Sequence, residues 1–159
     1  MKTDNVLATR PHKVIYRDGD KVWKVFDANY PKTDVLNEAL NQARVEETGL
    51  PIPRVHGVTV NEEGKWAIIS DYIEGETLAE KMEKDPENVE KYMKEFVEIQ
   101  LEIHDKTAPL LNKMKDKMSV RINSLKAVNA TTRYELSTRL ESMPKHKKVL
   151  HGDYNPTNV

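Results

Sequence analysis

The sequence contains no cysteine, which excludes disulfide bonds and thiolate metal sites. No apolar run is long enough to cross a bilayer, and residues 1–14 lack the apolar segment of a signal peptide. The 25 lysines and arginines nearly balance the 26 aspartates and glutamates, so the basic footprint of a nucleic-acid-binding protein is absent overall. We therefore expect a cytoplasmic protein that has neither a membrane segment nor a nucleic-acid partner.

Aromatic residues are scarce, at 6% of 159 residues, whereas charged residues make up 32%. Such a composition is typical of disordered chains, but apolar residues recur with regular periods along this one, which favours a folded protein. The length suits one domain or two small lobes. The composition is that of a globular protein with long charged helices.

The front of the chain has the alternating pattern of β-strands. Runs 13–19 and 20–27 meet at an Asp-Gly-Asp turn, and runs 54–64 and 65–73 meet at a polar turn, so two hairpins are predicted. Strand alternation in the second run puts three side chains on one face, those of Val22, Lys24 and Phe26.

Between the two hairpins, residues 33–47 have the pattern of a helix. Thr33 or Asp34 can cap its start, and its apolar stripe is predicted from the spacing of three residues, Leu36, Leu40 and Ala43. Gly49 and the prolines that follow end it.

The back of the chain is predicted to be helical, starting from a change in composition at Glu74 and Gly75. Apolar residues at helical spacing predict helices over 85–104, 114–125 and 132–143. Thr132 and Glu135 form a capping-box pair, and residues 147–153 return to a strand-like pattern. The fold class is therefore α+β, with a lobe of residues 1–74 followed by a helical part of residues 75–159.

The last nine residues, HGDYNPTNV, place Asp153 and Asn158 five positions apart in a loop of turn-forming residues. In phosphoryl transfer, an aspartate accepts the proton of the attacking hydroxyl, and an asparagine five residues later ligates magnesium. The H-x-D-x-x-x-x-N pattern meets both needs on one loop. Taken alone, the motif fits an ordinary Asp/Asn turn at the end of a strand equally well.

Lys24 lies in the middle of a strand among apolar neighbours, where a phosphoryl-transfer site places a lysine that reaches the nucleotide phosphates. Such a lysine needs a helix glutamate to orient it, and Glu38 is the candidate, with Glu46 and Glu47 as rivals near the frayed helix end. A solvated strand lysine and a solvent-facing glutamate are the alternative interpretations.

The segment IISDYIEGETL, residues 68–78, runs from apolar residues into a polar connector between the two halves. Its backbone N–H and C=O groups can face the edge of an adenine ring. It is equally interpretable as a plain linker between lobes.

Taken in order, the segments VWKVF, NEAL, ISDYIEGETL, EIQLEIHD and HGDYNPTNV resemble the landmarks of the aminoglycoside phosphotransferase and choline kinase family. These are small-molecule kinases with a protein-kinase-like fold. The resemblance covers nearly the whole chain, and its most specific element is the HGDxxxxN loop. The ordered set of segments is more specific than any one motif.

The resemblance implies a role for each matching residue. Asp153 would be the catalytic base, Asn158 a magnesium ligand, and Lys24, paired with Glu38, the residue that holds the phosphates of ATP or GTP. His151 would be a structural residue of the loop, and His104 a packing or capping residue. The purine would lie against a set of five residues, Val22, Ser70, Asp71, Tyr72 and Ile73.

Two departures from the family pattern affect what we expect. The turn in IYRDGD, interpreted as the turn over the phosphates, has one glycine, so backbone amides would contribute little there. The family also has a further metal-binding aspartate and the substrate-binding helices after HGDxxxxN. A chain ending at Val159 lacks both, so we expect a truncated kinase that is inactive alone and able to self-associate through exposed helical faces.

Three functions follow from these observations. The first is an ATP- or GTP-dependent kinase acting on a hydroxyl of a small molecule, with Mg²⁺ as cofactor. The second is a non-catalytic fragment or pseudokinase that binds nucleotide or a protein partner. The third is a helical interaction module in which the motif matches are accidental.

Overall fold

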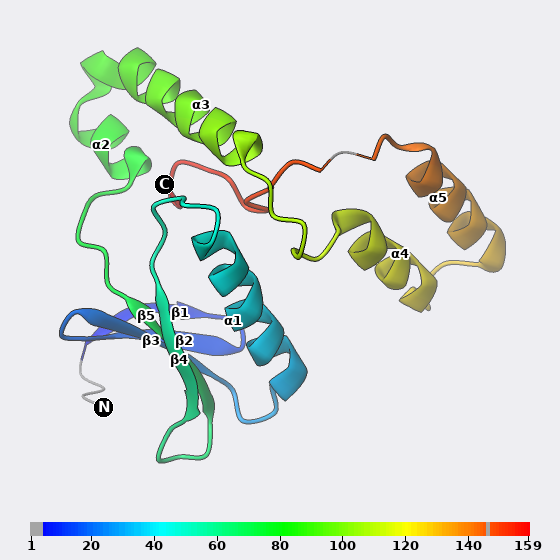
Figure 1. Cartoon of the computed structure of the whole chain (residues 1–159), viewed down its shortest axis with the longest axis horizontal. Coiled ribbons are helices and arrows are strands. Elements are labelled where there is room, and N and C mark those ends of the chain that lie inside the picture. Colours follow the sequence, from blue (N-terminus) through cyan, green and yellow to red (C-terminus); the bar gives the residue numbers. More distant parts are fainter. Residues whose placement is uncertain (1–4, 146) are drawn as a thin grey trace. The chain divides into compact units, whose positions relative to one another are not determined.

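The computed structural model describes residues 5–145 and 147–159, and this part of the chain divides into two compact units. One unit contains residues up to 108 together with residues 148–159, and the other spans residues 109–147. A boundary between lobes at residues 74 and 75 remains a prediction. Each unit is described by itself (Figure 1).

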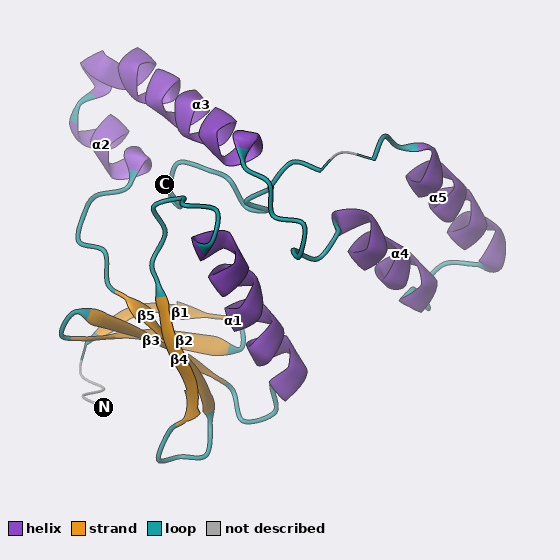
Figure 2. Ribbon diagram, in the orientation of Figure 1, coloured by secondary structure: helices purple, strands orange, loops and turns teal. Residues whose placement is uncertain are grey.

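The first unit is built on a five-stranded antiparallel sheet with the order β1-β2-β3-β5-β4 (Figure 2). Both predicted hairpins are present. The sequence pattern missed the edge strand β1, because its large apolar residues, Val6 and Leu7, are about half exposed and show no alternation. The strands are β1 (Val6–Arg10), β2 (Lys13–Asp18), β3 (Lys21–Phe26), β4 (Val55–Val60) and β5 (Trp66–Asp71).

Helix α1 (Lys32–Glu46) packs against β4 and β5, and the core lies between them. Four buried residues form this core: Phe26, Val35, Ala39 and Ile68. Burial of such side chains stabilises the fold by about 25 cal/mol for each Å² of apolar surface that is removed from water. The core therefore fixes which face of α1 is turned toward the sheet.

Two predictions about α1 are wrong. Leu36 and Leu40 are 42% and 49% exposed, and the row facing the sheet starts one residue earlier, at Val35. Polar residues of that row bond to the chain leading into β4, because Gln42 Nε2 donates to the Pro53 carbonyl (2.8 Å) and Glu46 accepts from the Val55 N–H (2.7 Å). The helix is preceded by Pro31, and no side chain caps it.

Helices α2 (Leu78–Lys84) and α3 (Val89–Asp105) follow β5, joined by the 3₁₀ turn η1 (Pro86–Asn88). The sequence reading missed α2, although Thr77 and Glu80 form a complete capping box at its start. Residues 148–159 form a loop, so the strand predicted over 147–153 is wrong. Within residues 147–153 only Val149 is a buried hydrophobic residue, so the alternating burial of a strand is absent there. Further along the loop, the carbonyls of Pro156 and Val159 accept from N–H groups of α2.

The second unit is a helix pair, α4 (Met114–Ser124) and α5 (Ala130–Ser142). Asn129 caps α5 by accepting from the Thr132 N–H (2.8 Å), so the capping box predicted at Thr132 is wrong. Lys115 Nζ ties the two helices together by donating to carbonyls near the end of α5. Several apolar side chains of this pair are exposed, including Val120 and Tyr134.

The α+β class predicted from the sequence is confirmed, with a β-rich front that carries one helix and a back made of helices. Among the described residues, no helix has both the length and the apolar character that a membrane span requires.

Candidate active site

Lys24 and Glu38 are joined by an ion pair between the sheet and α1. The Nζ of Lys24 lies 2.6 Å from Oε1 of Glu38, and the two side chains are 25% and 29% exposed. The β3–β5 register places buried Ile68 opposite Lys24, while Glu38 follows Val35 by three residues on the face of α1 that meets the sheet. The local geometry thus selects Glu38 over Glu46.

Lys13, the first residue of β2, shares the same carboxylate. Its Nζ lies 3.4 Å from each oxygen of Glu38. Burial alone would raise the pKa of Glu38, but the hydrogen bond from Lys24 and the charges of Lys24 and Lys13 outweigh it and lower that pKa. The glutamate is therefore held as a carboxylate between two ammonium groups.

Asp153 is exposed and is held by two asparagine side chains of its own loop. Asn155 Nδ2 donates to Oδ1 of Asp153 (3.1 Å), and Asn158 Nδ2 donates to Oδ2 (3.0 Å). Both amides also reach the Asp153 carbonyl. Gly152 has a φ of 87°, a conformation that glycine adopts without strain. The loop thus fixes the direction of one exposed carboxylate.

Two contacts anchor this loop to the helices that follow the sheet. The Tyr154 ring stacks on Phe96 of α3 with centroids 4.3 Å apart, and its hydroxyl donates to the Phe96 carbonyl. The first two N–H groups of α2 donate to the carbonyls of Val159 (2.6 Å) and Pro156 (2.9 Å). These are N–H groups that a helix cannot satisfy internally, so the loop completes the start of α2.

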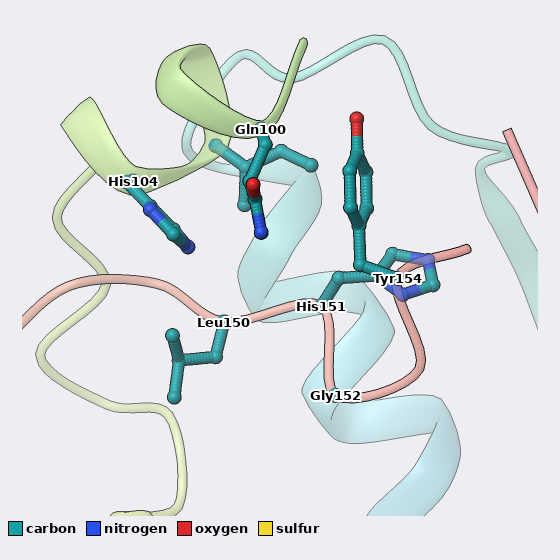
Figure 3. Close-up of a pocket in the computed structure, with 7 residues that line it drawn as sticks. Gln100, His104, Leu150, His151, Gly152 and Tyr154 are labelled. Carbon is teal, nitrogen blue, oxygen red and sulfur yellow. The ribbon is translucent and has the colours of Figure 1, made fainter. Parts of the chain in front are cut away.

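A pocket of about 240 Å³ lies between the end of α3 and the loop (Figure 3). His151 is exposed; its ring meets that of Tyr154 edge-on, with centroids 5.7 Å apart, and its Nδ1 accepts from the Asp153 N–H (3.3 Å). The structural role expected for this histidine stays a prediction. His104, interpreted as a packing or capping residue, is half-buried and lines the pocket. The lining residues are Gln100, Ile103, His104, Leu150, His151, Gly152 and Tyr154.

The Asp71 side chain, assigned by resemblance to the purine site, is engaged within the sheet. Its carboxylate accepts from Lys21 Nζ (3.1 Å) and the Arg54 N–H (3.1 Å), and lies 2.5 Å from His56 Nε2. The hydrogen bond with His56, followed by those from Lys21 and Arg54, holds the pKa of Asp71 far below its usual range. This carboxylate ties β3, β4 and β5 together, and the Asp71 N–H donates to the Arg54 carbonyl (3.0 Å).

The remaining residues of the expected purine site surround the end of β5. Val22 pairs with Ser70 across β3 and β5. The Tyr72 N–H donates to the Asp20 carbonyl (2.9 Å), and the Arg17 guanidinium lies 3.8 Å from the centre of the Tyr72 ring. Ile73 is 65% exposed at the start of the connector.

The prediction that the turn in IYRDGD lies over the phosphates is wrong. This β2–β3 turn bonds to Tyr72, at the end of the sheet where the resemblance places the purine. The turn beyond Lys24 is the one between β1 and β2, because Lys13 pairs with Phe26 and the Asp27 N–H donates to the His12 carbonyl (2.9 Å). Strand β1 was not recognised in the sequence, so the sequence alone could not reveal this turn.

The structure brings the residues predicted for phosphate binding, catalysis and metal binding together as two pairs, Lys24 with Glu38 and Asp153 with Asn158. No hydrogen bond or ion pair among the described residues joins one pair to the other. Across the same residues, no cluster of three or more histidine, aspartate or glutamate side chains could hold a metal ion. Sequence reasoning missed Lys13 and treated Asn155 only as a turn residue.

A five-stranded sheet whose lysine pairs with a helix glutamate, followed by helices and an H-x-D-x-x-x-x-N loop, defines a phosphotransferase with a protein-kinase-like fold. The family model described as "Phosphotransferase enzyme family" matches residues 12–159. The chain belongs to this family, and its resemblance to aminoglycoside phosphotransferases and choline kinases is confirmed. No curated protein matches the sequence.

Proposed function

We propose that this chain carries the nucleotide site and the catalytic loop of a kinase that phosphorylates a hydroxyl of a small molecule with ATP or GTP. The observation that carries the proposal is the 2.6 Å contact between Lys24 and Glu38 in a member of the phosphotransferase family. A lysine oriented in this way presents its ammonium group to the nucleotide phosphates.

In this proposal Asp153 accepts the proton of the acceptor hydroxyl. The hydroxyl oxygen bonds to the γ-phosphorus while the bond to the β–γ bridging oxygen breaks, and the nucleoside diphosphate leaves. The amides of Asn155 and Asn158 hold both carboxylate oxygens of Asp153, which keeps the base in one orientation before the substrate arrives.

Asn158 and Asp153 also supply oxygen atoms of the kind that Mg²⁺ prefers. Asn158 uses its amide nitrogen to bind Asp153, so its carbonyl oxygen is the side-chain atom suited to a metal. Magnesium is commonly held by one or two protein oxygens together with substrate phosphates, so the residues fit the ion. When bound, Mg²⁺ neutralises charge on the transferring phosphoryl group.

The purine is proposed to lie against Val22 and Ser70–Ile73, through backbone groups other than the N–H groups of Asp71 and Tyr72, which donate to the carbonyls of Arg54 and Asp20. A nucleoside triphosphate as donor suits the cytoplasmic location expected from the sequence. The partners we propose are a small hydroxyl compound and, through exposed apolar residues of the helices, a second copy of the chain.

Phosphorylation of candidate acceptors by the protein that carries this chain tests the proposal. The panel contains aminoglycosides, choline-like amines, amino acids and sugars, each with ATP or GTP and Mg²⁺. Asp153→Asn preserves shape but removes the base, so turnover is expected to fall by about 10²- to 10⁴-fold. Asp116→Asn, an equivalent change at an exposed aspartate of α4, is the control and leaves turnover unchanged. Undiminished activity in Asp153→Asn refutes the assignment.

A nucleotide-binding chain that transfers no phosphate is the second candidate. It is favoured by the lack of a cluster of three or more metal-binding side chains among residues 5–145 and 147–159. The polypeptide of residues 1–159 would then bind ATP, lose that binding in Lys24→Met, and phosphorylate none of the acceptors. Turnover by this polypeptide alone excludes this candidate and the expectation that it is inactive.

A further inference from the structure

The β1–β2 turn, which lies at the phosphate end of the sheet, has few backbone donors to offer. It consists of Pro11 and His12 between the paired residues Arg10 and Lys13. Pro11 has no N–H group, and a turn this short cannot form the wide glycine-rich loop whose amides cover phosphates in protein kinases. An anion at this end of the sheet must be held mainly by side chains.

The turn is nevertheless held in one conformation. His12 has a φ of 67°, the only positive φ of a residue other than glycine in the described chain, and proline followed by a positive φ is the pattern of a type II turn. The His12 carbonyl accepts from the Asp27 N–H, and its Nδ1 lies 3.4 Å from Asp27 Oδ2. A strained residue fixed from outside is a feature that often accompanies a binding site.

Lys13 follows this strained residue and is directed to the Lys24–Glu38 pair. Its ammonium lies 3.4 Å from both Glu38 oxygens and 5.5 Å from the centre of the Phe26 ring. Phe26 is only 1% exposed, so a rigid ring and a fixed carboxylate together position the lysine. The Lys13 side chain is 28% exposed, which leaves part of it accessible to a ligand.

The charges at this point do not balance. Two ammonium groups share one carboxylate, and in the described part of the chain neither Lys13 nor Lys24 forms an ion pair with another acidic group. Asp27, the acidic residue at the turn, lies 3.4 Å from His12 Nδ1 and forms no ion pair with Lys13 or Lys24 in the described part of the chain. One positive charge therefore remains for an incoming anion, in a partly buried place where charge-assisted hydrogen bonds are strong.

We infer that Lys13 is a second phosphate-binding residue, whose ammonium supplies the contact that backbone amides of a glycine-rich turn would otherwise make to the terminal phosphates of the nucleotide. The inference rests on the proposed function, since it assigns a further ligand contact to the same site. It requires phosphate binding to depend on salt, because each cation that neutralises a phosphate is screened by added ions.

Calorimetry with three ligands, ATP, inorganic tripolyphosphate and adenosine, distinguishes a contact to the phosphates from a contact to the nucleoside. Lys13→Met is expected to weaken ATP and tripolyphosphate binding about tenfold, the effect of one lost charge-assisted contact. Adenosine binding stays the same, and the salt dependence of ATP binding becomes shallower. Lys13→Arg retains most of the affinity, because it retains the charge.

The control is Lys84→Met, which removes the last residue of α2, a lysine that forms an ion pair with Glu76. It leaves all three affinities unchanged. Lys13→Gln, which is neutral but polar, replaces Lys13→Met if circular dichroism shows that the methionine variant is unfolded. Wild-type ATP affinity in a folded neutral variant overturns the inference and leaves the proposed function intact. Failure of the wild-type chain to bind ATP overturns both.

Discussion

Glu38→Gln removes the one negative charge that lies between Lys13 and Lys24. Its effect on the free energy of unfolding tests whether the two lysines share this carboxylate. Lys13 and Lys24 both contact Glu38 Oε1, at 3.4 and 2.6 Å. Glutamine keeps the shape of the side chain and loses its charge. The variant should therefore leave two ammonium groups facing each other across a neutral amide, a worse situation than the loss of either lysine alone.

The size of the effect follows from the geometry. Two nitrogens at 2.6 and 3.4 Å from one oxygen lie within about 6 Å of each other, where unit charges repel by about 1 to 3 kcal/mol between the dielectric of water and that of a protein surface. The lost attraction to Glu38 adds to this. We expect Glu38→Gln to lower the free energy of unfolding by about 2 to 3 kcal/mol, whereas Lys13→Met alone costs less than about 1 kcal/mol.

The combination of the two changes gives the sharpest result. In the Glu38→Gln background, Lys13→Met removes a repulsion instead of an attraction, so it should stabilise the protein by about 1 kcal/mol. Urea unfolding followed by the fluorescence of Trp23 and Trp66 measures these differences, since both tryptophans of the chain lie in the sheet. If Lys13→Met destabilises both backgrounds equally, the two lysines do not share the carboxylate and the reasoning fails.

Three further predictions concern the loop and pH. Asn155→Ala should reduce turnover about threefold to tenfold without changing nucleotide affinity, since it releases one oxygen of Asp153; equal rates would contradict a positioning role. Tyr154→Phe should lower the free energy of unfolding by about 1 kcal/mol, measured in urea, through loss of the bond to the Phe96 carbonyl; an unchanged midpoint would contradict it. Because the pKa of Glu38 is lowered on folding, its stabilisation is complete above its unfolded value of about 4.3 and is lost as pH falls below it. Acid titration should therefore destabilise the wild type more steeply than Glu38→Gln, and parallel curves would refute this.

The part of the site that the sequence predicts is the part encoded by neighbouring residues. Lys24 stands out because apolar side chains flank it in a strand, and the turn residues between the runs locate the hairpins. Glu38 is the candidate partner of that lysine, with Glu46 and Glu47 as rivals that the sequence does not exclude, and the structure places Glu38 Oε1 2.6 Å from Lys24 Nζ. The catalytic roles of Asp153 and Asn158 stay predictions.

What the sequence could not give depends on contacts between distant segments. The face of α1 that is turned toward the sheet depends on contacts between the helix and strands that are distant in the sequence. These contacts bury Val35 and leave Leu36 exposed, although the apolar pattern predicted that Leu36 would be buried. Lys13 contacts Glu38 across 25 positions of the chain, and nothing in the residues around it indicates that partner. The position of the turn beyond Lys24 depended on β1, whose exposed residues carry no alternation.

The bonds from the first turn of α2 to the loop have a mechanical consequence. The chain passes from Ile73 to Thr77 and then donates two N–H groups to the loop that bears Asp153. This stretch of five residues spans at most about 17 Å. A displacement of the connector at Ile73 would therefore move the loop through these few residues and the first turn of α2. This route does not include α1 or the Lys24–Glu38 pair. If the purine binds at Ile73 and Asp153 is the base, as proposed, binding of the purine would be coupled to the position of the Asp153 side chain.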